Sequence, residues 1–371
     1  MKLLNLKLKN YRNCRDLDLN LNHEKVLIIG KNAQGKTNIL ESIYFLSSLK
    51  SPRASNNLEL INFDENKFEI DAEIIKADTE ITLLYSYDRE KNKEIKINGV
   101  KSRPKDFKQV LKTVLFSTED LLLLRGNPQD RRDWLDRAIS QVYPAYDERL
   151  SKYEKIRIQK NNFLKDYAKT GNFNETLFDV YNEQLIITGS NIIYLRKKFL
   201  KEIEKIAKEK HFTISNTEDL KIEYDCNFIE KEDTETEQIA EKFKQALNER
   251  KQEEIRRGQA CVGPHRDDVI FYINSEEATK YASQGQQRTM VLALKLSELD
   301  IITQKTGDEP ILLLDDVLSE LDRNRQNQLL NSISGIQTVI TCTGLEEFIR
   351  ERLKCDRIYR VDNGTVSEII E

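Results

Sequence analysis

Short apolar stretches near the two ends of the chain have the pattern expected of an α/β fold. Residues 2–8, 67–75 and 80–87 largely alternate between polar and apolar side chains, which is typical of strands with one buried face. Residues 26–29 and 311–314 are instead continuous apolar runs, as in parallel strands that are covered on both faces. We therefore predict an α/β protein in which a mixed sheet adjoins an antiparallel β region.

Two Asn-Gly pairs indicate hairpin turns in this β-rich sequence. Asn98-Gly99 follows the short strand pattern at residues 94–97. Asn363-Gly364 separates residues 357–361 from residues 365–370, which predicts a terminal hairpin. Asn-Gly suits such turns because both central residues of a tight hairpin need positive φ angles.

The middle of the chain has the spacing of helices. Apolar residues step by three or four positions from Leu135 to Ile156 and from Leu185 to Ile206, and a charged helical stretch covers residues 236–257. Asn127-Pro128 has the form of a helix start. We expect Pro144 to kink the first of these helices.

This change of pattern divides the chain into three segments. We predict that residues 1–126 form the N-terminal part of an α/β head, that residues 127–257 form an inserted helical lobe, and that residues 258–371 complete the head. A length of 371 residues exceeds the usual size of one domain, which agrees with two lobes. The predicted helices are far too short for a long coiled-coil arm.

The segment at residues 30–37, with the sequence GKNAQGKT, matches the phosphate-binding pattern G-x-x-x-x-G-K-[ST] at every fixed position. This segment, called the P-loop below, follows a predicted strand and precedes helical spacing at residues 39–46, which is the required context. Its glycines let backbone N–H groups face phosphates, and the following helix adds its positive dipole end. We expect Lys36 to reach the β- and γ-phosphates and Thr37 to bind Mg²⁺. The predicted nucleotide-binding residues of this segment are Gly30, Lys31, Asn32, Ala33, Gln34, Gly35, Lys36, Thr37 and Asn38. The alternative is a glycine-rich turn that binds nothing.

Two carboxylates, Asp315 and Asp316, follow the buried strand predicted at residues 311–314. Ligands of α/β sheets bind at the carboxyl ends of the parallel strands. We expect Asp315 to orient Mg²⁺, and Asp316 to position an attacking water or take its proton. The alternative is a pair of solvated loop acids, although two adjacent acids are costly to desolvate without a nearby cation.

The segment Ser283-Gln284-Gly285-Gln286 begins another predicted helix. A hydroxyl at Ser283, a closely approaching N–H at Gly285 and the helix N-terminus together form a possible second anion site. The contacts that we predict here are Ser283, Gly285 and Gln286. On its own this pattern is common. It is more informative here because it precedes the predicted strand that is followed by Asp315 and Asp316.

The composition limits the remaining possibilities. Hydrophobic residues are 39% and charged residues 33% of the chain, and the net charge of −4 does not indicate a nucleic-acid partner, so any DNA contact must come from local basic patches. The five cysteines and three histidines are scattered without a C-x-x-C pair, which argues against a zinc site or a disulfide framework and favours a reducing cytoplasm. No apolar run approaches the roughly 18–20 residues that span a membrane, and the N-terminus does not have the form of a signal peptide.

Together these motifs resemble the ABC-type ATPase heads of the SMC-like class, with Ser319–Asp322 similar to their D-loop. More narrowly, the chain is similar to the RecF family of bacterial recombination mediators. The resemblance lies in residues 32–38, 115–121, 130–132, 262–268, 283–288 and 314–322, which occur in the family's order.

Some positions depart from the family pattern. Pro52 stands where a histidine is more usual before Arg53. The second acid of the Walker B motif is Asp316, where most ABC ATPases have glutamate. An aspartate here looks normal within the RecF family, and its shorter side chain suggests slow hydrolysis. No histidine follows the strand predicted at residues 336–341, so Thr341 or Thr343 stands in the switch region, and Glu119 is the candidate for the Q-loop position.

The resemblance implies an ATP- and Mg²⁺-dependent homodimer of two-fold symmetry. In such heads, residues Ser283–Gln286 of one subunit cover the γ-phosphate that the P-loop of the other subunit holds. ATP would then be part of the interface, and hydrolysis would release the dimer. The implied enzyme activity is a weak, DNA-stimulated ATPase that acts as a switch.

The resemblance also implies partners. The ATP-bound dimer would clamp single- or double-stranded DNA at gap junctions and act with RecR, and with RecO, to load RecA in the cytoplasm during repair and the SOS response. Candidate phosphate contacts are Arg53, Arg125, Arg131, Arg132, Arg256 and Arg257. For each of them, the alternative is a solvated charged surface. His265 is either a structural histidine at a lobe junction or part of an interface.

Other functions remain as alternatives. A different SMC-like ATPase, such as the ATPase of a double-strand-break nuclease, would have a C-x-x-C hook and longer helices. A transporter-type ABC ATPase would have a Q-loop and a switch histidine, and would lack the insert at residues 127–257. A scaffold with a structural ATP is a further class.

Overall fold

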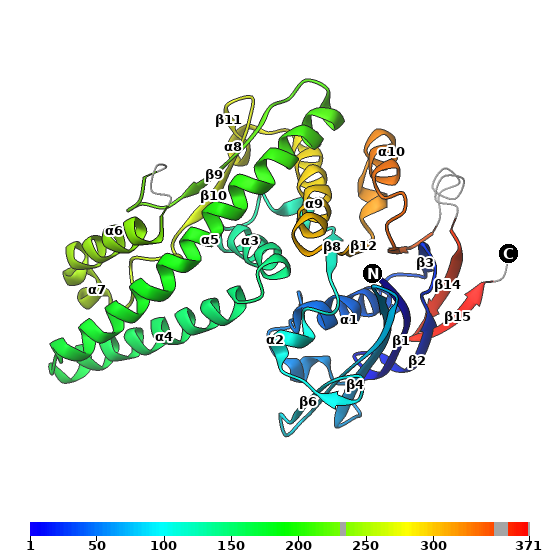
Figure 1. Cartoon of the computed structure of the whole chain (residues 1–371), viewed down its shortest axis with the longest axis horizontal. Helices are drawn as coiled ribbons and strands as arrows, with labels where there is room; N and C mark the ends of the chain where they lie inside the picture. Colours follow the sequence, from blue (N-terminus) through cyan, green and yellow to red (C-terminus); the bar gives the residue numbers. More distant parts are fainter. Residues whose placement is uncertain (231–234, 345–354, 370–371) are drawn as a thin grey trace. The chain divides into compact units, whose positions relative to one another are not determined.

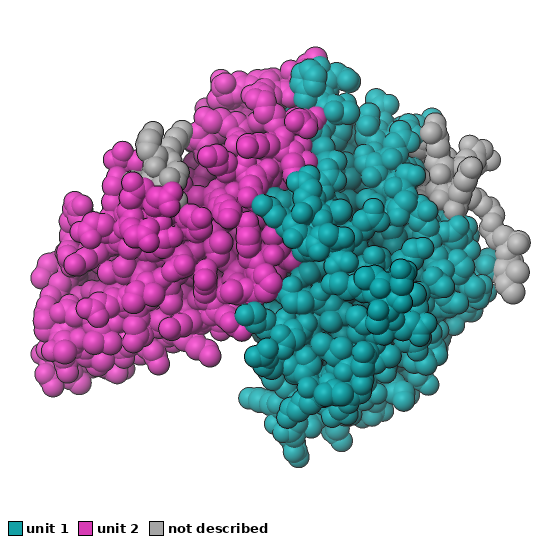
Figure 2. Space-filling model, in the orientation of Figure 1, with its two compact units in different colours: residues 1–122, 210–216, 284–371 teal, residues 123–209, 217–283 magenta. Residues whose placement is uncertain are grey.

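The computed structural model of the chain describes residues 1–230, 235–344 and 355–369 (Figure 1). The chain forms two compact units (Figure 2). Unit 1 comprises Met1–Leu122, Lys210–Asn216 and Gln284–Glu371, and unit 2 comprises Leu123–Glu209 and Thr217–Ser283. Residues 258–283, which the sequence pattern assigned to the head, therefore cluster with unit 2.

Unit 1 contains a six-stranded antiparallel sheet of order β2-β1-β4-β5-β6-β7. Its strands have one buried face, as their alternating side chains predict. The turn between the last two strands uses positive φ angles of 51° at Asn98 and 74° at Gly99. The strands are β1 (Lys2–Tyr11), β2 (Cys14–Asn20), β4 (Lys67–Lys76), β5 (Thr79–Asp88), β6 (Lys93–Ile97) and β7 (Val100–Lys101).

The second sheet of unit 1 is mixed and has the order β15-β14-β3-β13-β12-β8. All of its strands are parallel except β15, which forms the predicted terminal hairpin with β14. The strands are β3 (Lys25–Ile29), β8 (Thr113–Ser117), β12 (Ile311–Asp315), β13 (Thr338–Cys342), β14 (Arg357–Asp362) and β15 (Thr365–Ile369). Residue 370, at the end of the predicted hairpin, lies outside the described residues. Because β3 and β12 are parallel members of one sheet, the segments that follow them lie at the same edge.

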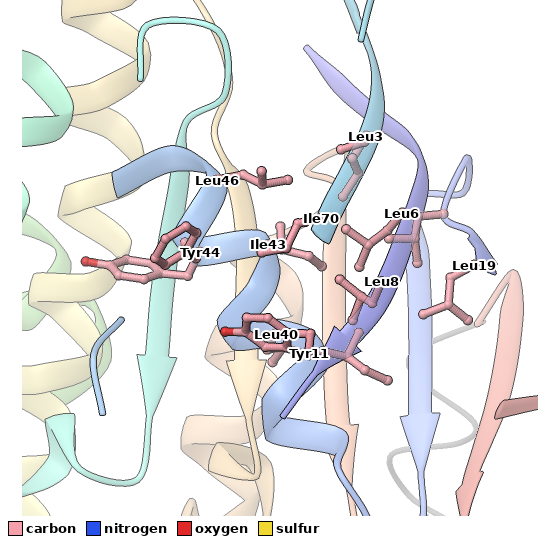
Figure 3. Close-up of a cluster of buried hydrophobic side chains, with 14 of the residues drawn as sticks. Leu3, Leu6, Leu8, Tyr11, Leu19, Leu40, Ile43, Tyr44, Leu46 and Ile70 are labelled. Atoms are coloured by element: carbon pink, nitrogen blue, oxygen red, sulfur yellow. The ribbon is translucent and has the colours of Figure 1, made fainter. Parts of the chain in front are cut away.

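A buried apolar cluster joins the antiparallel sheet to helix α1 (Lys36–Ser48). Figure 3 shows side chains of β1 and α1 gathered in this cluster, among them Leu6, Leu8, Leu40 and Ile43, all with no exposed surface. The side chain of Gln337 links the two sheets. It accepts a hydrogen bond from the backbone N of Leu3 (2.7 Å) and donates to the carbonyl oxygens of Leu3 (2.8 Å) and Leu21 (2.7 Å).

The remaining helices and turns of unit 1 pack against strands of both sheets (Figure 1). Helix α9 begins at Gln284 and has buried residues along most of its length, which explains why its apolar pattern has no single face. These elements are α2 (Pro104–Phe107), α9 (Gln284–Thr306), α10 (Arg323–Ser332) and the 3₁₀ turns η1 (Asn57–Leu60), η2 (Asp120–Leu122) and η3 (Val317–Glu320).

Unit 2 contains the helices predicted for the middle of the chain and, in addition, an antiparallel three-stranded sheet of order β11-β10-β9 that we did not predict. Helix α5 belongs to unit 2 up to Glu209, and its last turns belong to unit 1. The elements are α3 (Pro128–Val142), α4 (Tyr146–Thr170), α5 (Glu175–Ser215), β9 (Leu220–Asp225), α6 (Thr236–Glu249), α7 (Lys251–Arg257), β10 (Asp268–Ile273), β11 (Glu276–Glu277) and α8 (Ala278–Tyr281).

Two of the helix predictions need correction. Pro144 does not kink one helix: α3 ends at Val142 and α4 starts at Tyr146, because proline cannot donate the helical hydrogen bond and clashes with the preceding turn. The stretch at residues 236–257 is two helices, with a break at Arg250. Among the described residues, none of the helices combines the length and the apolar character that crossing a membrane requires.

Candidate nucleotide-binding site

The P-loop occupies the turn between β3 and α1, as its sequence predicts. Gly35 precedes the helix with φ = 113°, and a Cβ atom there would lie 2.7 Å from the side chain of Asn13. A Cβ atom on Gly30 would lie 2.5 Å from the carbonyl oxygen of Val361 in β14. Both glycines therefore have close neighbours that leave no room for a side chain, and Gly35 also has a backbone conformation that favours glycine.

The ammonium group of Lys36 is held inside the P-loop. The side chain is 4% exposed, and Nζ donates to the carbonyl oxygens of Gly30 (2.9 Å) and Lys31 (3.2 Å). The same Nζ lies 3.8 Å from Oδ2 of Asp316. A buried cation is thus fixed between the loop and the carboxylate pair, where it offers positive charge to an anion bound by the loop.

The hydroxyl of Thr37 meets the first carboxylate directly. Thr37 donates to Oδ1 of Asp315 (3.0 Å), and Thr341 of the neighbouring strand β13 donates to the same oxygen (2.8 Å). The hydroxyl of Thr341 also accepts from the backbone N of Asp316 (3.0 Å). One carboxylate and one hydroxyl form the protein donor set typical of Mg²⁺ that is bound together with a nucleotide, whose phosphate oxygens supply further ligands. The described residues contain no group of three or more His, Cys, Asp or Glu that would hold a metal without such help.

Asp316 has an unusual backbone conformation, with φ = 54° and ψ = 14°. Aspartate tolerates this left-handed region better than most residues. Burial raises the pKa of the Asp316 carboxyl, the charge of Lys36 opposes that shift, and the charge of Asp315 adds to it. A carboxyl with a raised pKa beside a cation is chemically suited to hold or pass on a proton.

The predicted anion site at the start of α9 is braced by α10. Nη2 of Arg325 donates to the carbonyl oxygen of Gly285 (2.7 Å), and Nε donates to the hydroxyl of Thr289 (2.8 Å). Arg288, on the same helix, pairs with Glu320 of the D-loop segment at 3.1 Å. Ser283 directly precedes the helix, and Gln286 is in its first turn. The structure therefore joins Lys36 and Thr37 to the Walker B acids, whereas Gly285 is bonded to α10.

The helix that follows the P-loop carries a buried carboxylate that the sequence analysis did not identify. Glu41 of α1 is 1% exposed and binds Arg12 through both oxygens (2.5 and 2.7 Å). Arg53, one of the predicted DNA contacts, donates from Nη2 to Glu41 (2.6 Å) and to Oδ1 of Asn38 (2.6 Å). Burial alone would raise the pKa of Glu41, but hydrogen bonds from Arg12 and Ser51 and the charge of Arg53 hold it below its usual value. No local pattern could have shown this, because Arg12 comes from the β1–β2 turn and Ser51 and Arg53 come from the segment after α1.

The other predicted DNA contacts, all in unit 2, differ in exposure. Arg131 is buried and binds both carboxylate oxygens of Asp268 (2.8 and 2.7 Å). Arg132 is also buried and donates to the carbonyl oxygen of Asp267 (2.5 Å). The exposed members of the set are Arg125, Arg256 and Arg257, of which the last pairs with Glu253 at 2.8 Å.

Comparison with known proteins gives a family model and relatives that match nearly the whole chain. The family described as RecF/RecN/SMC N terminal domain matches residues 2–367. The DNA replication and repair protein RecF of Natranaerobius thermophilus is 42% identical to the chain, over 98% of the chain and 97% of that protein. The chain belongs to the RecF family. The DNA replication and repair protein RecF of Bacillus subtilis is 39% identical to the chain, over 99% of the chain and 100% of that protein.

A solved relative supports the family fold as well. A structure of the recombination mediator protein RecF-ATP in the RecFOR pathway is 35% identical to this chain, covers 100% of it and 98% of the solved chain, and has a TM-score of 0.92. The predicted resemblance to the RecF family and the predicted α/β ATPase-head architecture are therefore confirmed. The P-loop, residues Ser283–Gln286 and strand β12 with its carboxylate pair all lie within the matched range.

Proposed function

We propose that this RecF-family protein is an ATP-gated DNA-binding switch of recombinational repair and replication restart. The observation that carries the proposal is the direct contact between the P-loop and the Walker B strand. Thr37 is hydrogen-bonded to Asp315, and Lys36 lies beside Asp316. A solved RecF relative that contains ATP, similar over the whole chain, gives independent support for the nucleotide.

In the proposed reaction the P-loop and the two carboxylates that face it have separate tasks. Backbone N–H groups of residues 30–37 and the Lys36 ammonium would bind the phosphates of ATP, while Thr37 and Asp315 would hold Mg²⁺. The metal supplies charge neutralisation and orientation of the phosphates when it is bound. Asp316 would orient the attacking water and accept its proton. Because Asp316 is shorter than glutamate, we propose that hydrolysis is slow and limits the lifetime of the ATP state.

We further propose that ATP assembles a two-fold homodimer. Ser283, Gly285 and Gln286 of one copy would cover the γ-phosphate bound by the other copy, at the N-terminus of α9. The Arg325 brace on Gly285 supports this role, because it fixes the first turn of the helix before any partner arrives. Since nucleotide would form part of the interface, ATP occupancy and dimerisation would be linked by mass action.

The proposed dimer clamps single- or double-stranded DNA at gap junctions. We keep Arg53, Arg125, Arg256 and Arg257 as candidate phosphate contacts because their side chains are at least partly exposed. For Arg131 and Arg132 we propose a structural role, because their guanidinium groups serve acceptors of unit 2 itself. Contacts to the phosphate backbone make binding depend steeply on salt and little on sequence.

As partners we propose RecR and RecO, with RecA loaded at gaps during repair and the SOS response. Family membership and the RecFOR pathway named for the solved relative support this assignment. We also propose that the protein works in the cytoplasm. Its five cysteines are all free thiols, as is usual in a reducing compartment.

Sedimentation of the protein with ATP, with ADP and without nucleotide tests the switch. We expect the wild type to dimerise with ATP and Mg²⁺ only, and Lys36→Met to lose both nucleotide binding and dimerisation. Asp316→Asn should bind ATP and stay dimeric for longer, because hydrolysis is blocked. Lys9→Met, an exposed lysine of β1, is the matched control and should behave as the wild type. A wild type that stays monomeric with ATP, or a Lys36→Met variant with unchanged ATP affinity, would contradict the proposal.

Filter binding tests the DNA part of the proposal. We expect ATP to increase retention of double-stranded DNA, and retention to fall as salt is raised. In the double variant Arg256→Ala/Arg257→Ala, the number of counterions released on DNA binding should fall by about one to two. The slope of binding affinity against salt concentration measures this number. DNA retention that ignores ATP in the wild type would contradict the mediator function while leaving nucleotide binding intact.

A further inference from the structure

Asn13, which follows β1 in the turn to β2, is hydrogen-bonded to the C-terminal part of the P-loop and to the helix that follows it. Its Nδ2 atom donates to the carbonyl oxygen of Gln34 (2.9 Å), inside the P-loop. Its Oδ1 atom accepts from Nδ2 of Asn38 (2.7 Å), in the first turn of α1. One planar amide thus connects the last peptides of the loop with the helix that the loop starts.

The packing around Gly35 shows how closely Asn13 supports the loop. A Cβ atom on Gly35 would lie 2.7 Å from Nδ2 and from Oδ1 of Asn13. The side chain of Asn13 therefore lies directly against the Cα atom of the glycine whose φ is 113°. A side chain at this position would collide with Asn13, so the close packing of Asn13 on the loop requires glycine here.

The turn between β14 and β15 holds the same point of the loop from another segment of the chain. The backbone N of Gly364 donates to the Gln34 carbonyl oxygen (2.9 Å), and the backbone N of Asn363 donates to Oε1 of Gln34 (2.6 Å). The carbonyl group of Gln34 accordingly accepts two hydrogen bonds, and its side chain is also occupied. Because this carbonyl shares one planar peptide with the N–H of Gly35, these two hydrogen bonds also orient that N–H group.

We infer that Asn13 is a positioning residue for nucleotide binding, which holds the P-loop in the conformation that accepts phosphates. The inference rests on the proposed ATP-binding function. Only a side-chain amide offers a donor and an acceptor in one plane at this reach, which explains the residue type. Asn13 acts through Gln34 and Asn38, and its recorded contacts do not include Asp315 or Asp316. It therefore controls affinity for the nucleotide and leaves the chemical step to the Walker B acids.

Removing the donor should weaken nucleotide binding because part of the binding free energy is then spent on ordering the loop. Loss of one such hydrogen bond together with a freed loop corresponds to an increase of about tenfold in Kd for ATP. At saturating ATP, kcat should stay within about twofold of the wild type, because the loop is ordered once ATP is bound. A residue that only stabilised the fold would not separate these two quantities.

The test uses the full chain and Asn13→Asp, which keeps the shape and the acceptor but loses the donor at high pH. We expect Kd for ATP with Mg²⁺ to rise about tenfold relative to the wild type near pH 8. An ionised carboxylate facing the carbonyl oxygen of Gln34 is disfavoured, which raises the pKa of the introduced carboxyl. As the pH is lowered toward about 5, a growing fraction of the carboxyl takes up a proton and can donate to Gln34 again, so the ratio of the two Kd values should fall. Asn13→Ala, which has neither group, should show a deficit that does not vary with pH. Asn20→Asp, the same change on an exposed residue at the far end of β2, is the control and should match the wild type.

The outcomes separate the inference from the function on which it rests. Each variant is compared by its melting temperature without nucleotide, and Asn13→Ala replaces Asn13→Asp in the comparison at pH 8 if the latter does not fold. If the wild type binds ATP, Lys36→Met does not, and the Asn13 variants bind as the wild type, the positioning role is wrong and the ATPase assignment stands. A deficit of Asn13→Asp that is equal at all pH values, or a parallel fall in kcat, also overturns the role. If the wild type binds no ATP, the proposed function fails and the inference fails with it.

Discussion

Thr37 and Asp315 are 278 positions apart in the chain, and the hydroxyl of Thr37 donates a hydrogen bond of 3.0 Å to Oδ1 of Asp315. The sheet order makes this possible, since β13 lies between β3 and β12 and all three strands are parallel. Their carboxyl ends therefore meet at one edge, and the helix that follows β3 brings its first hydroxyl to the acid that ends β12. The contact joins the two halves of the predicted metal site.

Replacing Asp315 should remove most of the effect of Mg²⁺ on nucleotide binding. In Asp315→Asn the hydrogen bonds from Thr37 and Thr341 can be kept by the amide oxygen, but the negative charge that attracts the metal is lost. We expect the gain in ATP affinity on adding Mg²⁺ to fall by about tenfold or more. Titration of ATP at several Mg²⁺ concentrations measures it, with Asp18→Asn, an exposed acid of β2, as control. An unchanged Mg²⁺ dependence would disprove the metal role.

Arg325→Ala should separate dimerisation from nucleotide binding. The change removes the donors to Gly285 and Thr289, so the first turn of α9 loses its brace while the P-loop is untouched. We expect ATP affinity of the monomer to be within about twofold of the wild type, and the ATP-dependent dimer to weaken by about tenfold. Sedimentation at several protein concentrations gives both results. Equal loss of ATP binding in the monomer would show that the brace acts on the P-loop instead.

Arg131→Ala should destabilise unit 2. The change leaves the carboxylate of Asp268, which is 20% exposed, without either of its hydrogen bonds from the guanidinium group. We expect the free energy of unfolding to fall by about 2 kcal/mol, as for other half-buried charges that lose their partner. Urea unfolding measures the loss, and Arg256→Ala, an exposed arginine, is the control that should change stability little. If Arg131→Ala were as stable as the control and only DNA retention fell, Arg131 would be a DNA contact after all.

His265 should make unit 2 lose stability in acid. Nε2 faces the carbonyl oxygen of Ala260 (3.2 Å) and must carry the proton, so Nδ1 accepts from the hydroxyl of Tyr153 (2.7 Å). Burial lowers the pKa of His265 from 6.5 to about 3, with the Ala260 hydrogen bond opposing the shift and nearby arginines adding to it. The unfolded chain therefore binds more protons than the folded chain between these two pKa values, and stability present above pH 6.5 is lost as the pH falls toward 3.

The variant His265→Gln isolates this effect, because glutamine can make both hydrogen bonds and does not titrate. Asp267 acts in the opposite direction, since burial raises the pKa of its carboxyl from 3.8 to about 6 and the folded state binds its proton first. The difference in unfolding free energy between wild type and variant removes the Asp267 contribution. Below pH 6.5 we expect this difference to change by up to about 1.4 kcal/mol per pH unit, in favour of the variant as the pH falls. Parallel pH profiles would mean that His265 is not buried in its neutral form.

Gly364→Ala should weaken nucleotide binding from a position outside the P-loop. Gly364 has φ = 75°, and a Cβ atom there would lie 2.1 Å from the carbonyl oxygen of Asn13. The terminal turn must therefore move away from Asn13 and lose its bond to Gln34. We expect Kd for ATP to rise by about tenfold, measured by titration. Gly99→Ala, in a turn of the same kind with no atom within 4 Å of the added Cβ, carries the same backbone strain and should leave ATP binding unchanged.

Some parts of the fold follow from local pattern, and others do not. The strand before the P-loop, the helix after it and the acids after β12 were predictable because each signal lies within a few neighbouring residues. The sheet of unit 2 was missed because β9 and β10 are short and separated by more than forty residues, so neither is stable alone. The pairing of Arg131 with Asp268 was missed for the same reason, since the two are 137 positions apart.

The phosphate-binding role that we propose for residues 30–37 was predicted from residue types alone, because a glycine turn and a helix start are built by neighbours in sequence. The groups that surround this loop cannot be predicted from residue types in this way. Its hydrogen-bond partners include Asn13, Asp315, Cys342 and Gly364, which lie in four distant segments. They meet because β14, β3, β13 and β12 are parallel neighbours in one sheet and because the β1–β2 turn packs on the loop. Strand order is a property of the whole chain, since it depends on which buried surfaces fit together, and no local stretch of sequence encodes it.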